Sequence, residues 1–142
     1  MVKVKRLIAT IVTAGLLAAL AACGSGGGGA AKEFASGKVG NVTVSLANPE
    51  GVLRDGDQQL TVTFKDASGK PVDVGSASLN FHMPAMGTMP VMNDPATLTT
   101  TAAPGVYSGK VKLEMAGEWQ AQIAYEGPAG TGKGSFPVTA QP

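Results

Sequence analysis

Four methionines recur at every third position in the stretch HMPAMGTMPVM, residues 82–92, and a histidine precedes them. They are Met83, Met86, Met89 and Met92, and the histidine is His82. A thioether is a soft, neutral donor that suits Cu(I) where cysteine would be oxidised, and imidazole is an acceptable companion ligand. Methionine also fills gaps in cores and forms flexible apolar surfaces for partners, so the residues alone leave three interpretations open.

The backbone of this stretch limits which residues can share one ion. Pro84 and Pro90 argue against an α-helix. A straight polyproline-type run would space the methionines about 9 Å apart, too far for metal–ligand bonds of about 2.3 Å. Gly87 is the residue at which a bend costs least. We therefore expect Met86 and Met89 to form a chelating pair around the bend. A third ligand is expected from one of His82, Met83 and Met92.

Strands must position this segment, because apolar residues alternate with polar ones along most of the chain. The alternating apolar residues are Val42, Val44, Leu46, Leu60, Val62, Phe64, Leu79, Phe81, Met83, Val111, Leu113, Trp119, Ala121, Ile123, Tyr125, Phe136 and Val138. A period of two predicts half-buried strands, and turn-forming residues separate the segments. We predict an antiparallel β-sandwich of immunoglobulin or cupredoxin type, with about seven strands and Trp119 at the core centre. His82 should face away from that core.

The beginning of the chain predicts export and a lipid anchor. Lys3, Lys5 and Arg6 precede an apolar run that ends in the sequence LAAC, which is typical of a bacterial lipoprotein signal covering residues 1–22. Cys23 would then carry the lipid and attach the protein to a membrane facing the periplasm or cell exterior. Gly24 mildly favours an outer membrane if there is one. Residues 23–38 are expected to be a flexible glycine-rich linker, and residues 39–142 one domain.

Charge and residue inventory exclude several classes of protein. Loss of residues 1–22 leaves eight basic residues against ten acidic ones, which does not attract nucleic acid. The segment GPAGTGKG, residues 127–134, has the spacing of a phosphate-binding loop but lacks the Ser or Thr after the lysine, so no nucleotide is expected. With a single histidine and no cysteine beyond the lipidated one, we expect no enzyme and no catalytic residue.

Three stretches carry a resemblance to a known family: FHMPAMGTMP, PGVYSGKVKLEMAGEWQAQIAY and GSFPVTA. The most specific features are Met-Pro-x-Met-Gly at residues 83–87, Pro-Gly-x-Tyr at 104–107 and Met-Ala-Gly-x-Trp at 115–119. Over about residues 39–139 the chain resembles the YtkA-like domain, which is related to the FixH-like proteins. The resemblance implies a small exported β-sandwich, frequently a lipoprotein or an extension of a metal-efflux adaptor or copper-oxidase assembly protein.

Together these features predict a lipid-anchored extracytoplasmic protein that binds Cu(I) or another soft metal through the methionine-rich loop. It would exchange the ion with membrane metal-efflux or oxidase-assembly proteins by ligand exchange. The alternative is a metal-free interaction module that docks a methionine edge onto a membrane protein complex.

Overall fold

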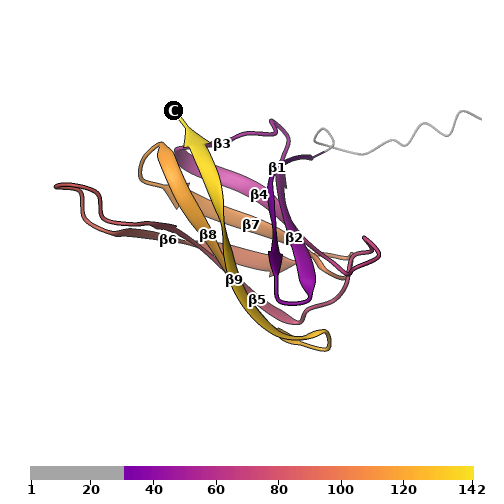
Figure 1. Ribbon diagram of the computed structural model, residues 1–142. Helices are drawn as coiled ribbons and strands as arrows, with labels where there is room; N and C mark the ends of the chain where they lie inside the picture. The colour runs from indigo at the N-terminus through magenta and orange to yellow at the C-terminus, as the bar shows by residue number, and fades with distance from the viewer. Residues whose placement is uncertain (1–30) are drawn as a thin grey trace, which may run out of the picture.

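The structure, a computed structural model, describes residues 31–142, and these form nine β-strands (Figure 1). The strands are β1 (Lys32–Val39), β2 (Val42–Asn48), β3 (Leu53–Arg54), β4 (Gly56–Lys65), β5 (Ser76–Met83), β6 (Met92–Thr100), β7 (Val106–Leu113), β8 (Gly117–Gly127) and β9 (Gly130–Gln141). This part of the chain contains no helix of the length and hydropathy that crossing a membrane requires. The predicted signal sequence, Cys23 and the first part of the expected linker lie outside the described residues.

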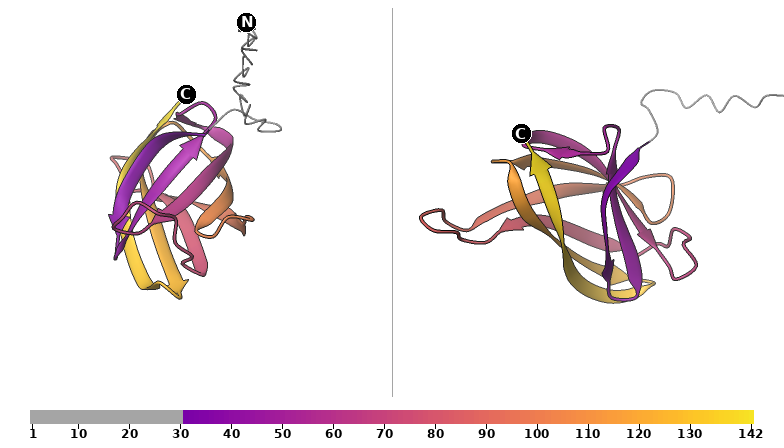
Figure 2. Two further views of the ribbon diagram at one scale, coloured as in Figure 1. Left: turned by 90° about the vertical axis from the view of Figure 1, so that its right-hand side faces the viewer. Right: turned by 45° about the horizontal axis from the view of Figure 1, so that its top comes forward.

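The strands follow one another in the order β1-β2-β4-β7-β6-β5-β8-β9-β3 and fold into two facing layers (Figures 1 and 2). Neighbours pair antiparallel except β3 and β9, which run parallel. The all-β antiparallel sandwich predicted from the sequence is confirmed, with nine strands instead of about seven. Alternation does not reveal β1, which is irregular, β3, which has two residues, or β6, which contains a proline and mostly polar residues.

The folded domain begins earlier than the sequence indicates. Residues 32–38, expected to belong to the linker, form most of β1 and pair with β2, from Lys32 opposite Asn48 to Lys38 opposite Thr43. The register shifts between Glu33 and Ala35, and this irregularity breaks the alternation that would mark a strand. Residues 32–38 therefore belong to the folded domain and not to a linker.

β6 belongs to both layers and connects them. Its first half pairs with β5, from Met92 opposite Met83 to Ala96 opposite Leu79. Its second half pairs with β7, from Thr97 opposite Lys110 to Thr100 opposite Tyr107. One continuous strand thus passes from one sheet to the other. Met92, one of the predicted metal ligands, is its first residue.

The space between the layers is filled by one apolar core. Every residue that the alternation assigns to an inner face is buried, and Trp119 is the largest fully buried side chain. Its Nε1–H donates to the carbonyl oxygen of Met115 at 3.1 Å, so its polar atom is satisfied. Phe64 packs edge-on against Tyr107 and Tyr125, with ring centroids 5.4 and 6.0 Å away. The predicted role of Trp119 in the core is confirmed.

β1 and β9 close the side of the sandwich by packing against each other. A Cβ atom on Gly37 would lie 2.4 Å from Cδ1 of Phe136, so the aromatic ring rests directly on the glycine backbone. Gly134 of β9 similarly faces the backbone of Lys38 and Val39. Small residues at these positions allow the two strands to approach closely.

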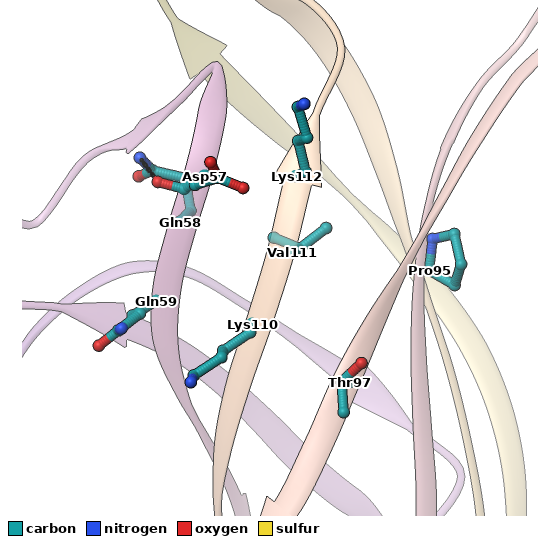
Figure 3. Close-up of a pocket in the computed structure, with 8 residues that line it drawn as sticks. All are labelled: Asp57, Gln58, Gln59, Pro95, Thr97, Lys110, Val111 and Lys112. Carbon is teal, nitrogen blue, oxygen red and sulfur yellow. Dashed lines mark hydrogen bonds between the residues drawn. The ribbon is translucent and has the colours of Figure 1, made fainter.

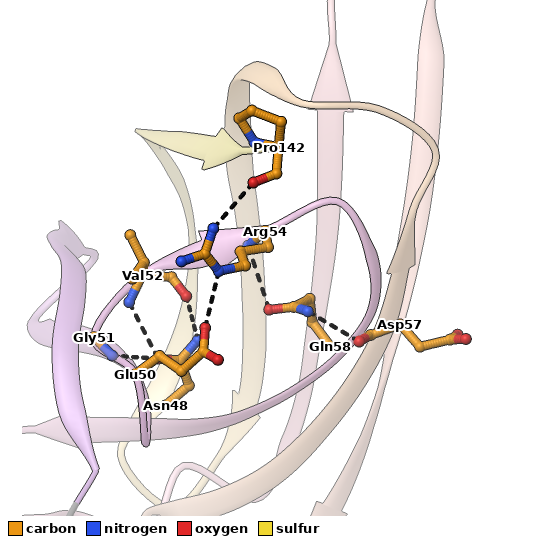
Figure 4. A network of polar contacts seen from close by, with 8 residues as sticks. All are labelled: Asn48, Glu50, Gly51, Val52, Arg54, Asp57, Gln58 and Pro142. Carbon is orange, nitrogen blue, oxygen red and sulfur yellow. Dashed lines mark hydrogen bonds and ion pairs between the residues drawn. The ribbon is translucent and has the colours of Figure 1, made fainter.

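A polar network fixes β3 and the C-terminus (Figure 4). Arg54 donates from Nε to Oε2 of Glu50 and from Nη1 to the carbonyl oxygen of Pro142, each at 3.0 Å. The Asn48 side chain accepts from Gly51 N–H at 2.6 Å and donates to the Val52 carbonyl at 2.6 Å. This part of the molecule has a structural role and lies on strands other than β5 and β6.

The hairpin β8–β9 accounts for the glycine-rich segment at residues 127–134. Gly127 pairs with Gly130 across a two-residue turn, and the pairing continues through Gly134 opposite Ile123. No helix follows the lysine, so the segment lacks the element that would face a phosphate. The segment is therefore a hairpin between two strands.

Candidate metal site

β5 and β6 are the arms of one hairpin, and its cross-strand register is the same at the base and at the tip. His82 pairs with Asn93 and Met83 with Met92 within the strands. Beyond them, Met86 and Met89 form an isolated antiparallel bridge in the same alignment. The four methionines therefore occupy two cross-strand pairs, one at the base and one at the tip. We call residues 83–92 the methionine hairpin.

The tip pair closes a two-residue turn. Met86 N–H donates to the carbonyl oxygen of Met89 at 3.2 Å, and Met89 N–H donates to that of Met86 at 2.9 Å. Gly87, the first residue of the turn, has φ of 57°, whereas no described non-glycine residue, Thr88 included, has a positive φ. A glycine with positive φ at this position is typical of a type II′ turn. The chain thus bends at Gly87, where the sequence places the bend.

The tip methionines lie side by side and are open to solvent. Directly opposite residues of an antiparallel pair have Cβ atoms about 4.5–5.5 Å apart on the same face, so two flexible thioethers can reach one ion. Met86 is 60% exposed and Met89 is 37% exposed. Together with Val91, they are the exposed large hydrophobic residues of the described chain. Such exposure removes core filling as an explanation for this pair.

The hairpin projects well beyond the sandwich (Figures 1 and 2). All residues from Pro84 to Val91 are exposed. The projection leaves the domain on the side away from the start of β1. The tip is therefore accessible from several directions.

The base pair has a different environment. Met83 is 3% exposed, and Met92 packs partly buried against the core. The Cε atom of Met83 lies against Gly117, where an added Cβ would be 3.1 Å away. Since residues three apart in an extended chain point to opposite faces, Met83 and Met86 are not brought together. The structure therefore does not place Met83 or Met92 as a third ligand beside the tip pair, and it explains both as core packing.

His82 faces away from the core, as the sequence predicts, and lies on the same face as the tip pair. Four residue steps of about 3.3 Å lead from His82 to Met86, so their Cα atoms are roughly 13 Å apart. Two donor atoms on one ion lie no more than about 4.5 Å apart, and side chains that stand roughly perpendicular to the sheet do not close most of this distance along the strand. His82 would therefore need the hairpin to bend before it could share an ion with Met86 and Met89.

Hydrogen bonds hold the His82 ring in place, and the sequence alone did not indicate them. His82 Nδ1 lies 2.9 Å from Oδ1 of Asn93. Asn80 donates from Nδ2 to the same oxygen at 3.2 Å and to Oε1 of Gln122 at 2.9 Å. The role of Asn93 becomes visible only once residues 92–100 are known to be a strand opposite β5.

The described residues contain no cluster of the common metal-binding side chains. Between residues 31 and 142 no three side chains of histidine, cysteine, aspartate or glutamate gather in a group that could hold an ion. A hollow on the outer face of β4 and β7 (Figure 3) is lined by polar groups that include Asp57, Thr97 and Lys110, and by none of the predicted ligands. The candidate site is thus the projecting thioether pair.

Comparison with known proteins gives one match. A family model described as YtkA-like matches residues 37–124, which is more than half of the chain. The matched region runs from within β1 to within β8 and contains the whole methionine hairpin. Searches of curated proteins and of solved structures returned no match.

Proposed function

The chain belongs to the YtkA-like family, and we propose that it is a lipid-anchored extracytoplasmic protein that carries a soft metal ion. Met86 and Met89 bind the ion, Cu(I) being the best fit to two thioethers, and Cys23 carries the lipid. The protein exchanges this cargo with membrane proteins that export the metal or install it in an oxidase. It has no catalytic role.

The observation that supports this proposal is the exposure of Met86 and Met89 as a cross-strand pair. Two solvent-exposed methionines forgo the stabilisation that burial of their side chains would give, so their exposure is better explained by binding than by folding. A thioether is uncharged at every pH and is not lost to disulfide formation. The pair therefore suits a soft ion in an oxidising compartment.

The small number of donors favours exchange over storage. The tip supplies two sulfurs, and His82, Met83 and Met92 are not within reach of them in this conformation. An ion bound by two weak, neutral ligands keeps open positions, and an incoming donor can join before the first ligands leave. Transfer between proteins requires such an intermediate.

The direction of the hairpin agrees with a carrier. The described chain starts at the side of the sandwich opposite the projecting tip (Figure 2). A lipid on Cys23 would hold the protein from the start of β1, so the tip would point away from the attachment point. Met86 and Met89 would thereby be presented to other proteins.

The second candidate is a metal-free interaction module, and the exposure of Val91 favours it. Val91 is 50% exposed and its side chain cannot bind a metal ion. Together with the tip methionines it forms an apolar edge of the kind that docks onto a partner. The two functions differ in whether sulfur is required.

A competition titration distinguishes them. The purified full chain in mild detergent is titrated with Cu(I) under reducing conditions against a coloured chelator. The same titration is run on the Met86→Leu, Met89→Leu variant, which keeps apolar volume and removes the thioethers. The matched control is Met83→Leu, Met92→Leu, in which the base pair is changed instead.

Cu(I) retained by the native chain and by the base variant, and lost from the tip variant, supports the carrier. If the tip variant binds as well as the native chain, or the native chain retains no Cu(I), the carrier function is wrong, and the docking module becomes the leading interpretation.

A further inference from the structure

We propose that a second copy of this chain completes the metal site. In this arrangement two methionine hairpins meet tip to tip, and Met86 and Met89 of each copy surround one soft ion. The inference rests on the function proposed above, since it requires that the tip pair binds metal. It adds the partner, the symmetry and the stoichiometry of the bound state.

The first argument is that one chain supplies an incomplete set of ligands. The tip provides two thioethers on one face. Met83 and Met92 lie on the opposite face and are engaged with the core, and His82 is separated from Met86 by about 13 Å along the strand. Within residues 31–142 no further soft donor lies beside the tip, since Met115 also packs against the core, and a second tip offers the same two sulfurs.

The second argument is access. Pro84 to Val91 are exposed, and the hairpin extends beyond the sandwich in Figure 1 and in the right-hand view of Figure 2. Two copies can therefore bring their tips together while the sandwiches stay apart. A site sunk in the face of a sheet would not permit this.

The third argument is charge. No Asp, Glu, Lys or Arg occurs between Met83 and Asn93. Asp94, the next residue, is buried, and its Oδ2 accepts the Glu114 N–H at 3.0 Å. Two identical tips therefore approach without the repulsion that like charges would cause.

The contact surface is too small to form a stable pair alone. Stable protein interfaces bury on the order of 1,200 Å² or more, and a hairpin tip with Met86, Met89 and Val91 as its large apolar residues is much smaller. The metal must then provide the bond between the copies. The symmetry follows, because two identical patches that face each other form a two-fold arrangement with the ion on the axis.

Two full-length chains that carry different peptide tags are mixed in mild detergent, and Cu(I) or Ag(I) is added in steps. One tag is captured at each step, and the amount of the other chain that is captured with it is measured. The expected co-capture is low without metal, rises at least tenfold to a maximum near half an ion per chain, and falls again with excess ion. The fall is expected because each tip can then hold its own ion. The tip variant Met86→Leu, Met89→Leu should stay at background, and Met83→Leu, Met92→Leu should behave as the native chain.

The outcomes separate the two proposals. Binding that saturates at one ion per chain without co-capture overturns the second-copy site and leaves the carrier function intact. Absence of metal binding overturns both. Co-capture that is equally strong without metal, or that persists in the tip variant, overturns metal bridging and assigns the contact to apolar docking.

Discussion

His82 Nδ1 and Asn93 Oδ1 lie 2.9 Å apart across the β5–β6 pair. The same oxygen accepts a hydrogen bond from Asn80 Nδ2 at 3.2 Å, so it acts as an acceptor in both contacts. The proton must then sit on Nδ1, which leaves the lone pair of the neutral ring on Nε2. Asn93 therefore selects one tautomer of His82.

Replacing Asn93 by leucine should abolish this selection. Ring-nitrogen chemical shifts, measured in alkaline solution where imidazole is neutral, are expected to report the Nδ1–H form in the native chain and a mixture of tautomers in Asn93→Leu. Asn93→Asp is the control, because a carboxylate also accepts from Nδ1–H and should keep the native tautomer. Identical ring shifts in the native chain and the leucine variant would refute the assignment.

Gly87→Ala should loosen the tip without unfolding the domain. The residue has φ of 57°, and nothing lies within 4 Å of an added Cβ, so the cost is backbone strain alone. A left-handed alanine costs about 1–2 kcal/mol, which lowers the ratio of closed to open turn about 5- to 30-fold. Hydrogen exchange at the Met86 and Met89 amides should accelerate by that factor, while the melting temperature stays unchanged. Gly87→Asn should exchange more slowly than the alanine variant, since asparagine tolerates this conformation better. Equal exchange in all three chains would argue against the turn.

Gly37→Ala should destabilise the whole sandwich. The new Cβ would lie 2.4 Å from Phe136 Cδ1, so the ring or β1 must move. Overpacking of this kind costs about 1–3 kcal/mol in the free energy of unfolding, measured by urea titration. Ser36→Ala, an exposed neighbour on β1, should change it by less than about 0.5 kcal/mol. Adding Phe136→Leu to Gly37→Ala should recover part of the loss, and a lack of recovery would place the strain elsewhere.

Tyr107 should make the stability fall in alkaline solution. Burial, with a smaller contribution from the negative charge of Asp73, raises the pKa of Tyr107 above its usual value of 10.0, and its hydroxyl donates to the Gly75 carbonyl at 2.6 Å. Because the folded chain holds this proton to higher pH than the unfolded chain, the contribution is complete below about pH 10 and is lost as the pH rises through the folded pKa. Urea unfolding from pH 8 to 11 should show a steeper decline for the native chain than for Tyr107→Phe. Parallel curves for the two chains would contradict this linkage.

The sequence predicts the strands whose two faces differ. In β5, Leu79, Phe81 and Met83 alternate with polar residues, and in β8 Trp119 and Ile123 do the same. The strands that it does not predict show no clear alternation of apolar and polar residues: β6 has Asp94 on its buried face, followed by Pro95, and β3 has two residues. Their pairing comes from neighbouring strands, which local periodicity does not encode.

Part of the candidate site could also be predicted from local features of the sequence. Proline and glycine placement indicated a bend at Gly87 and a close approach of Met86 to Met89. The separation of the four methionines into an exposed tip pair and a base pair packed on the core depends on the position of β6 opposite β5. The alternation along β5 already predicts that Met83 faces the core, whereas the position of Met92 beside it follows from the pairing of β6 with β5.

Because β6 pairs in both sheets, a force on the hairpin tip would be distributed over both of them. A pull on Met86 or Met89 travels down the hairpin arms into a strand that is hydrogen-bonded to β5 at one end and to β7 at the other. From β7 the strand order leads through β4 and β2 to β1, where the described chain begins. With the N-terminus anchored as proposed above, tension between it and a bound partner would be shared among successive ladders of hydrogen bonds, and no single strand pair would carry the whole force.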